Sequence, residues 1–511
     1  MTSQAAVVPA KSLSFTIGLL SLGSETLWIR TFAYHNESMA KALPSILGIY
    51  LLGIALGAAR GSRFCRDGGD LVVILGSSLL GGAAAIFLGP ILIAIGVETF
   101  ASARILHVVP AFLTAFAFAV CFPICHHLGT VVKAGGTGKS MSRVYAANIA
   151  GSVIGPLFVN FGLLQFATTQ LAFALLGLLA CSIALPILFT TTRGAFKSAG
   201  IAGTIVAVAS VTASAGPTNW LIGVFRNDPL AGIVETRQGI VVSYRQEHGG
   251  DVIFGGNVYD GRTNLDPRVN SNLINRVLVL AALRPAPRRV LEIGVSIGTW
   301  NYLITGFPGV EKIDVIEINP GYLDLMKNYP EQERALLDPR VNLMIGDGRK
   351  ILRSHPETAY DLVVMNTTWH WRAYTSLLLS REFLTLVRAR MAPGALLAYN
   401  STGSPDVLFT AAMVFPHAYL YDNFVIAADF DWRTRLDDRS AIDELRRIRP
   451  EGKPLFSAGD EALIHSFLSR ERTATVEQVS TKTGRPLEII TDRNLITEFK
   501  YGRPMFDRWG W

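Results

Sequence analysis

Three acidic side chains stand at the ends of short apolar runs in the second half of the chain. Glu292 ends RRVLE, Glu317 ends KIDVIE and Asp347 follows VNLMIG. Such runs predict strands, and parallel strands bring their carboxyl ends to one edge of a sheet, where ligands bind. Glu317 suits the two hydroxyls of a ribose and Asp347 suits an adenine amino group. The order favours an adenosine moiety without pyrophosphate, hence S-adenosylmethionine or a relative. The alternative is an ordinary α/β domain with acids at these places by chance.

A glycine-rich turn follows the first of these strands and precedes a helical stretch, WNYLIT. Gly294 and Gly298 permit a tight turn and a close approach of the backbone to a ligand. A helix that starts directly after such a turn offers free amides. We therefore expect Gly294, Ser296 and Gly298 to join Glu292 and Glu317 in binding the donor.

The segment MNTTWHWR, residues 365–372, follows the fourth predicted strand, YDLVV, and reaches the same edge of the sheet. Trp369 can stack on adenine or face a sulfonium cation. His370 is the side chain there that exchanges a proton near neutral pH. Asn366 can orient an acceptor by hydrogen bonds, but it is not a useful base. In the alternative interpretation Trp369 anchors the loop and His370 is bonded to the backbone.

These residues need an open, mostly parallel sheet to bring them together. Short β-branched runs alternating with helical stretches predict an α/β Rossmann-like domain of class I methyltransferase type over 276–511. The preceding region, 217–275, contains GIVVSYRQEHGGDVIFGGNVYDG, which alternates like a small antiparallel β unit. The two regions together predict a β unit that gates the site, followed by the domain that binds the donor.

The first 216 residues are of a different kind. The chain has 511 residues, of which 50% are hydrophobic and 17% charged, and its mean hydropathy is +0.34. That is too apolar for a purely soluble enzyme. We expect a multi-pass transmembrane α-helical domain over 1–216, because most of its apolar runs reach the roughly 17–25 residues that cross a bilayer. About seven segments are predicted, at 13–29, 43–59, 71–97, 105–125, 144–163, 171–189 and 199–213.

Small and charged residues inside these segments predict how they pack. Gly53 with Gly57 and Gly151 with Gly155 have the four-residue spacing that lets helix backbones approach closely in lipid. Glu25 and Arg30 are costly in lipid unless they pair or line a polar cavity. We interpret them either as an ion pair that fixes packing or as part of a substrate or proton path.

The side of the membrane is left open by the sequence. The Lys and Arg residues of alternate loops fall on one side, which should be cytoplasmic in a cell (inner) membrane. Seven membrane crossings would then put the soluble half outside the cell. A donor from the cytosol requires the soluble half on the cytoplasmic side, and therefore an even number of crossings. We expect the soluble half on the cytoplasmic side, with segment 199–213 either interfacial or re-entrant.

The order of motifs resembles the polyamine aminopropyltransferase (spermidine synthase) family. The motifs are VLEIGVSIGTW, VIEINPGYLDL, IGDGRKIL, YDLVVMN and IITDRNLITEF, while SETLWIR and VYAANIAGSVIGPLFV are similar to its membrane-fused members. The resemblance implies a spermidine-synthase-type domain in which Glu317 binds the ribose and Asp347 with Gly348 binds adenine. An acid at the position of Glu292 is also common in S-adenosylmethionine methyltransferases, where it sits near the methionine end of the donor.

The acids by which that family handles amines are absent from the matching positions. Ile297 stands where an acid meets the propylamine of the donor, and Asn366 begins the Asp-x-x-Asp catalytic segment. The substrate gate aligns with Tyr259 and with residues 270–272, Asn-Ser-Asn. Carboxylates supply both the charge and the base for an attacking amine, and an ammonium group without a partner loses its hydration. We therefore expect an uncharged acceptor site, which disfavours ordinary spermidine synthesis.

The expected function is a membrane-integral transferase with S-adenosylmethionine or its decarboxylated form as donor. It would methylate or aminopropylate an amine or amphipathic acceptor, with Asn366, His370 and Tyr259 at the reacting atoms and Trp369 beside the donor. One alternative is a transporter or carrier whose soluble domain senses a nucleoside. The other is a structural membrane protein with an inactive enzyme domain.

The expected partners follow from charge and cysteine placement. The four cysteines lie in or beside apolar runs without acidic partners, so no metal is expected. The net charge of +7 comes without a basic stripe with interleaved aromatic residues, so nucleic acid is not expected. A lipid bilayer is expected, and a homo-oligomer is left open.

Overall fold

The computed structural model describes residues 10–99, 108–130, 137–189 and 228–503. They divide into two compact units. One holds the described residues before 190 except Glu37–Lys41, and the other holds Glu37–Lys41 together with 228–503. We refer to them as the helical unit and the transferase unit. The predicted segment 199–213 lies outside the described residues.

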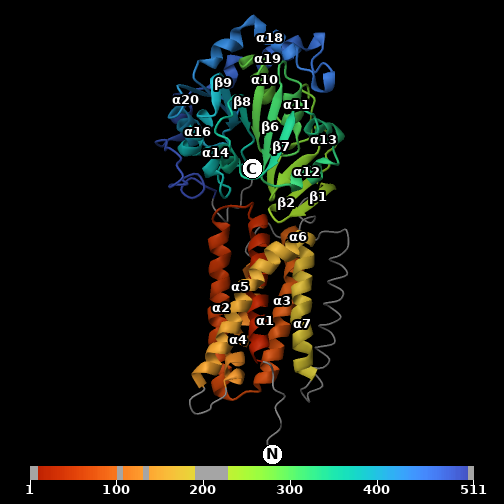
Figure 1. Ribbon diagram of the computed structural model, residues 1–511, viewed down its shortest axis with the longest axis vertical. Coiled ribbons are helices and arrows are strands. Elements are labelled where there is room, and N and C mark those ends of the chain that lie inside the picture. The colour runs from red at the N-terminus through yellow and green to blue at the C-terminus, as the bar shows by residue number, and fades with distance from the viewer. Residues whose placement is uncertain (1–9, 100–107, 131–136, 190–227, 504–511) are drawn as a thin grey trace, which may run out of the picture. The chain divides into compact units, whose positions relative to one another are not determined.

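The described residues of the helical unit form mostly long helices (Figure 1). Five described stretches are long and apolar enough to cross a membrane: 42–67, 71–93, 108–129, 138–166 and 169–189. The predicted segment 13–29 forms a helix, but it is not one of the five, because Ser, Thr and charged residues lower its hydropathy. The elements are α1 (Ala10–His35), α2 (Ala42–Asp67), α3 (Leu71–Thr99), α4 (Val108–Gly129), α5 (Thr137–Phe158), η2 (Val159–Leu163), α6 (Leu164–Phe166) and α7 (Thr169–Phe189).

Glycines set the closest helix contacts in this unit. A β-carbon added at Gly151 of α5 would lie 1.8 Å from the carbonyl oxygen of Phe15 in α1. One added at Gly57 of α2 would lie 2.3 Å from the carbonyl oxygen of Phe116 in α4. No other residue fits at such distances, so the predicted role of the glycine pairs in close helix packing is confirmed. α1 contacts α2, α4, α5 and α7.

The transferase unit contains two sheets. The smaller is antiparallel in the order β1-β2-β3-β4, which confirms the predicted small β unit. Its strands are β1 (Leu230–Thr236), β2 (Gly239–Tyr244), β3 (Val252–Gly255) and β4 (Val258–Arg262). The larger sheet has the order β12-β10-β11-β9-β8-β5-β6-β7. Its strands are β5 (Arg289–Ile293), β6 (Lys312–Glu317), β7 (Val341–Ile345), β8 (Tyr360–Met365), β9 (Met391–Asn400), β10 (His417–Tyr421), β11 (Phe424–Ala428) and β12 (Thr473–Ala474).

The larger sheet confirms the predicted Rossmann-like fold. Strands β5 to β9 run parallel, and β10, β11 and β12 are antiparallel additions at one edge. Because β5 pairs with β6 on one side and β8 on the other, the strand order reverses between β5 and β8. In open α/β sheets a ligand crevice forms at such a reversal, outside the carboxyl ends of the strands.

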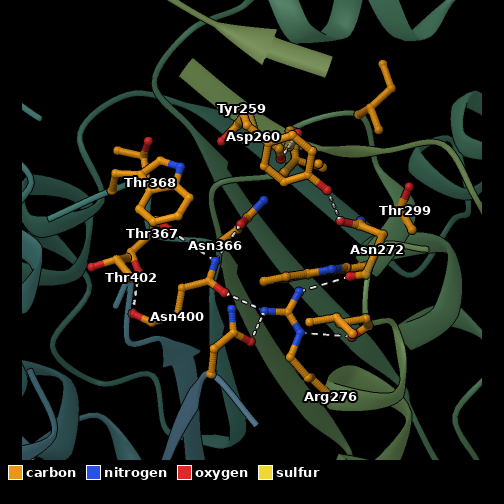
Figure 2. A pocket seen from close by; sticks show the side chains of 18 of the residues that line it. Tyr259, Asp260, Asn272, Arg276, Thr299, Asn366, Thr367, Thr368, Asn400 and Thr402 are labelled. Atoms are coloured by element: carbon orange, nitrogen blue, oxygen red, sulfur yellow. Dashed lines mark hydrogen bonds between the residues drawn. The ribbon is translucent and has the colours of Figure 1, made fainter. Parts of the chain in front are cut away.

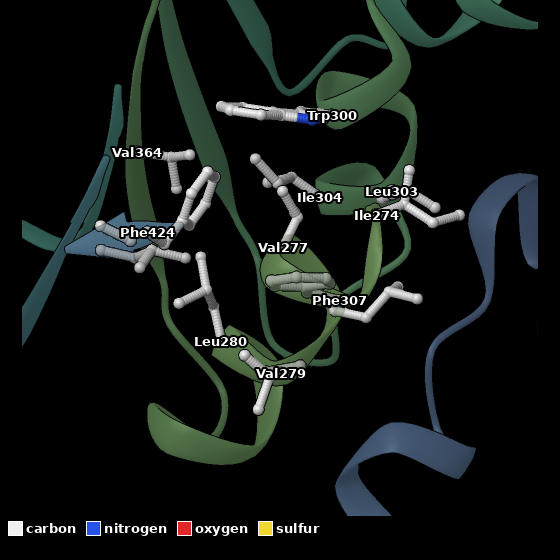
Figure 3. Packing of buried hydrophobic residues seen from close by; sticks show 14 of the residues in the cluster. Ile274, Val277, Val279, Leu280, Trp300, Leu303, Ile304, Phe307, Val364 and Phe424 are labelled. Carbon is white, nitrogen blue, oxygen red and sulfur yellow. The ribbon is translucent and has the colours of Figure 1, made fainter. Parts of the chain in front are cut away.

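Helices cover both faces of this sheet, because successive strand residues point to opposite faces. Val290 belongs to the cluster packed under α10 and α11, and the next residue, Leu291, to the cluster under α16 and α17. Figure 3 shows Val277, Leu280 and Trp300 of the first cluster packed together. The helices are α10 (Asn275–Leu283), α11 (Thr299–Thr305), α12 (Gly321–Met326), α13 (Pro330–Leu336), α14 (Gly348–Ser354), α15 (Ser376–Leu379), α16 (Arg381–Arg388), α17 (Pro405–Ala412), η3 (Trp432–Asp437), α18 (Arg439–Arg446), η4 (Pro450–Gly452), η5 (Ala458–Asp460), α19 (Glu461–Phe467), η6 (Arg470–Arg472) and α20 (Val476–Thr483).

The segment Glu37–Lys41 joins α1 to α2 in sequence but packs within the transferase unit. Met39 forms a small apolar cluster with Val258 and Trp371. The Nη1 atom of Arg503 donates a 2.5 Å hydrogen bond to Glu37 Oε2. The transferase unit therefore includes Glu37–Lys41, which lie inside the predicted range 1–216, and the predicted domain boundaries stay a prediction.

Candidate active site

A pocket of about 310 Å³ lies in the transferase unit at the carboxyl ends of β5, β8 and β9. Its wall combines the end of β4, the segment before α10, the turn after β5 and the loop after β8. Figure 2 shows Tyr259 and Asp260 on one side of it and Arg276 and Asn400 on the other. The predicted residues Tyr259, Ser296, Asn366 and Trp369 line this pocket.

The turn after β5 adopts the predicted tight conformation. Gly294 and Gly298 have φ angles of +83° and +79°, a region that favours glycine. A β-carbon at Gly294 would lie 2.9 Å from the carbonyl oxygen of Asn366. The turn therefore packs directly against the loop after β8. Ser296 donates a 3.1 Å hydrogen bond from Oγ to the carbonyl oxygen of Asp260, which ties the turn to the β unit as well.

Glu317 stands at the end of β6 and holds this turn through the backbone. Its Oε2 accepts a 2.9 Å bond from the Val295 amide, and its Oε1 accepts a 2.8 Å bond from the Asn319 amide. Burial raises the pKa of Glu317 to about 7, although both amides favour the carboxylate. The Ser296 amide also favours the carboxylate, and Glu317 is buried and does not line the pocket itself. Its predicted contact with a ribose stays a prediction.

Glu292 lies in the interior of the unit and does not line the pocket. Its Oε2 accepts a 3.1 Å bond from Asn301 Nδ2. Its Oε1 has no hydrogen-bond partner among the described residues. Burial raises the pKa of Glu292 to about 8. This glutamate lies in β5, directly before the glycine-rich turn, and its predicted contact with the donor stays a prediction.

Asp347 and Gly348 form the start of α14. Asp347 is exposed and caps the helix by accepting a 3.1 Å bond from the Lys350 amide. Gly348 is buried, and a β-carbon there would lie 3.0 Å from Ile293. Both residues lie outside the pocket wall, at the carboxyl end of β7. Their predicted contact with adenine stays a prediction.

The loop after β8 places its residues in different ways. Trp369 lines the pocket and stacks on Trp371, with ring centroids 6.3 Å apart. His370 lies off the pocket wall, and its Nδ1 donates a 2.7 Å bond to the carbonyl oxygen of Thr402. Burial lowers the pKa of His370. This is the arrangement of the alternative interpretation, in which the backbone holds His370, and its predicted catalytic role stays a prediction.

Tyr259 and Asp260 end the β unit at the pocket. The hydroxyl of Tyr259 donates a 3.1 Å bond to Asn272 Oδ1. Burial raises the pKa of Asp260, while the hydroxyl of Tyr322 and the charge of Arg372 oppose that shift. Asp260 is not among the site residues predicted from the sequence, where YDGR indicates only part of a strand. An acid directly before a glycine at a strand end was the available signal.

Arg276 is the second charged group that the sequence analysis missed. It lies on α10 with 5% of its surface exposed, and it lines the pocket. Burial lowers its pKa to about 10, so the guanidinium remains a cation near neutral pH. The signal was a lone arginine in the apolar run LINRVLVLAAL. With Asp260 and Arg276 on its wall, the pocket contradicts the expectation of an uncharged acceptor site.

Four oxygen atoms hold the guanidinium of Arg276. Nε donates to the carbonyl oxygen of Leu273 at 2.8 Å, and Nη2 donates to that of Asn272 at 3.0 Å. Nη1 donates to Asn400 Oδ1 at 2.9 Å and to Asn423 Oδ1 at 2.5 Å. All four acceptors are uncharged amide oxygens. In the described part of the chain no group of three or more His, Cys, Asp or Glu side chains is arranged to hold a metal ion.

Residues 274–408 match the family described as Spermine/spermidine synthase domain, so the predicted resemblance is confirmed there. The polyamine aminopropyltransferase of Mycobacterium tuberculosis is 24% identical over 409 residues, which cover 78% of this chain and 72% of that protein. Putrescine N-methyltransferase 4 of Nicotiana tabacum is 33% identical over 85 residues, 16% of this chain and 22% of that protein. The spermidine synthase structure from Thermotoga maritima has a TM-score of 0.37 at 16% identity, covering 47% of this chain and 84% of that chain.

Proposed function

We propose that this protein is a membrane-integral transferase of spermidine-synthase type. Its donor is a sulfonium nucleoside, S-adenosylmethionine or the decarboxylated form, and it alkylates an amine or amphipathic acceptor. One contact carries the proposal. The carboxylate of Glu317 accepts a hydrogen bond from the Val295 amide in the glycine-rich turn, and Val295 lines the pocket. Such a turn with an acid at the next strand end is typical of nucleoside binding in this fold class.

The chemistry is a displacement at carbon. The lone pair of the acceptor attacks the carbon bonded to the sulfonium, a new bond to that carbon forms and the carbon–sulfur bond breaks. Its electron pair stays on sulfur, which becomes a neutral thioether. An acceptor that arrives as an ammonium must also lose a proton. Among the described side chains on the pocket wall, Asp260 is the carboxylate that can take it, since the amide of Asn366 cannot.

Methyl transfer and aminopropyl transfer both remain within the proposal. The relatives named above include an aminopropyltransferase and a putrescine N-methyltransferase, so the same framework supports both reactions in other proteins. Ile297 lines the pocket, and it brings no charge to the alkyl chain of the donor. The apolar helices of the helical unit support a place in the bilayer, where an amphipathic acceptor is available.

The test is to identify the thioether product. Purified protein in detergent is incubated with each donor and a membrane extract, and the products are separated by mass spectrometry. Methyl transfer yields S-adenosylhomocysteine and aminopropyl transfer yields methylthioadenosine. We expect one of them to accumulate with the wild-type protein and not with Glu317→Ala. Formation of neither product with either donor contradicts the proposal.

A further inference from the structure

We propose that the acceptor side of this pocket binds a carboxylate through Arg276 and Asn366, so that its ligand carries an ammonium and a carboxylate in place of two ammonium groups. The inference rests on the proposed function, because it assumes that donor and acceptor meet in this pocket. It is carried by the direction of a chain of hydrogen bonds that starts at the guanidinium.

The chain fixes the orientation of Asn400. A guanidinium can only donate, so the atom of Asn400 that faces Arg276 is the oxygen. The Nδ2 of Asn400 then donates at 3.1 Å to the carbonyl oxygen of Thr367. A carbonyl can only accept, so both contacts require the same orientation of the amide. The assignment of nitrogen and oxygen in Asn400 therefore follows from its neighbours.

The same reasoning extends to Asn366. The Nδ2 of Asn400 also donates a 3.1 Å bond to Asn366 Oδ1. With its oxygen used in this way, Asn366 turns its NH₂ group to the pocket, which it lines (Figure 2). At this position the pocket therefore offers hydrogen-bond donors. An ammonium group has only donors and finds no acceptor there, whereas a carboxylate oxygen can accept a hydrogen bond from the NH₂ group.

The charge of Arg276 points the same way. No described carboxylate forms an ion pair with it, and the nearby Asp422 is engaged with Arg472 at 3.1 Å. Of its five N–H groups, four donate to the amide oxygens described above. The guanidinium also lies over the rings of Phe424 and Trp300, 4.5 Å and 5.7 Å from their centroids, and none of the groups that accept its hydrogen bonds carries a negative charge. Such a buried cation repels a second cation and favours an anion, because the surroundings screen charge weakly.

The opposite side of the pocket has the opposite polarity. Asp260 provides a carboxylate there, and in Figure 2 it lies away from Arg276, with Asn366 between them. One anion and one cation on facing walls match a ligand with an ammonium at one end and a carboxylate at the other. A diamine would place its second ammonium against the guanidinium.

Two ligands can supply this carboxylate. S-adenosylmethionine has an α-carboxylate that its decarboxylated form lacks, and an acceptor can carry one of its own. Calorimetry on the detergent-solubilised full chain separates the two sources. One arm compares S-adenosylmethionine with its decarboxylated form. The other saturates the protein with methylthioadenosine and compares 4-aminobutyrate with putrescine, which differ by a carboxylate in place of one aminomethyl group.

We expect the carboxylate-bearing ligand to bind at least about tenfold more tightly in one arm, the effect of a hydrogen bond to a charged group. Arg276→Met should abolish the preference. Asn366→Asp should reverse it, because an aspartate still accepts from Asn400 but presents an oxygen to the pocket. Arg284→Met is the matched control, since Arg284 directly follows the same helix and pairs with Asp361 away from the pocket wall. It should keep the preference.

The outcomes separate this inference from the proposed function. Methylthioadenosine that fails to bind contradicts the donor site itself. Methylthioadenosine that binds, with equal or tighter binding of the amine-only ligand in both arms, overturns the carboxylate site alone. If Arg276→Met no longer unfolds cooperatively on heating, that variant is not folded, and the binding preference of Asn366→Asp becomes the test. An unchanged preference in Asn366→Asp overturns the inference.

Discussion

The two sides of the candidate site present opposite hydrogen-bonding groups. On the predicted donor side, the carboxylate of Glu317 ends β6 and accepts hydrogen bonds from the Val295 and Asn319 amides. On the acceptor side, Asn366 ends β8 and its NH₂ group faces the pocket, because Asn400 takes its oxygen. Strands that end at one edge of a single sheet thus carry groups of opposite hydrogen-bonding character.

The hydrogen-bonding character of the two sides is determined by different parts of the chain. The donor side depends on backbone: Glu317 accepts two main-chain amides, and the turn needs the positive φ angles of Gly294 and Gly298. The acceptor side depends on side chains, since the guanidinium of Arg276 directs Asn400 and through it Asn366. Side chains can be exchanged one at a time while the fold persists, whereas a backbone arrangement is lost as a whole.

The largest effect is expected from Glu317→Gln. An amide NH₂ would face either the Val295 or the Asn319 amide, leaving one buried N–H unpaired at a cost of about 1–3 kcal/mol. We expect methylthioadenosine binding to weaken by about 100-fold or more by calorimetry, since the turn and a ribose contact are lost together. Glu311→Gln is the matched control, because Glu311 directly precedes the same strand and bonds the exposed Arg288 away from the pocket wall. If Glu317→Gln bound methylthioadenosine within about threefold of the wild-type affinity, the predicted role of Glu317 on the donor side would be contradicted.

The places in the fold of the residues predicted to bind the donor followed from the sequence. Glu317 and Gly294 follow directly from strand ends and a glycine spacing, which are local properties of the chain. The two charges of the pocket wall could not be predicted in this way, because Asp260 comes from the β unit and Arg276 from a helix whose apolar neighbours predict a core element. A side chain on such a helix reaches a pocket only through the tertiary packing.

The side that the sequence analysis missed is tested by Asp260→Asn. Removing this carboxylate takes away the anion that would face an ammonium group. We expect calorimetric binding of ammonium-bearing ligands to weaken by about tenfold to a hundredfold, the range of a hydrogen bond to a charged group. Methylthioadenosine, which carries no ammonium, should bind as it does to the wild-type protein. Equal weakening for both kinds of ligand would mean that Asp260 supports the fold of the pocket.

Glu292 differs from Glu317 in that one of its carboxylate oxygens has no hydrogen-bond partner among the described residues. Its pKa rises from 4.5 in the unfolded chain to about 8 in the fold. The folded form therefore holds a proton that the unfolded form releases, so this contribution to stability is complete below pH 4.5 and is lost as the pH rises to about 8. Glu292→Gln should flatten the fall of Tm between pH 5 and 9 and raise Tm at pH 9 by roughly 2–4 °C for each kcal/mol recovered. A pH profile parallel to that of the wild-type protein would refute the buried, protonated state.

The smallest effect is expected from Asp347→Asn at the start of α14. Asparagine caps a helix about as well as aspartate, so the free energy of unfolding should change by less than about 0.5 kcal/mol. An uncharged oxygen accepts a weaker bond from an adenine amino group than a carboxylate does. Methylthioadenosine should bind about threefold to tenfold more weakly by calorimetry. Methylthioinosine lacks the amino group and should bind both proteins equally. An equal loss of affinity for the two nucleosides would show that Asp347 acts by stabilising the start of α14. In that case Asp347 would not contact the adenine amino group.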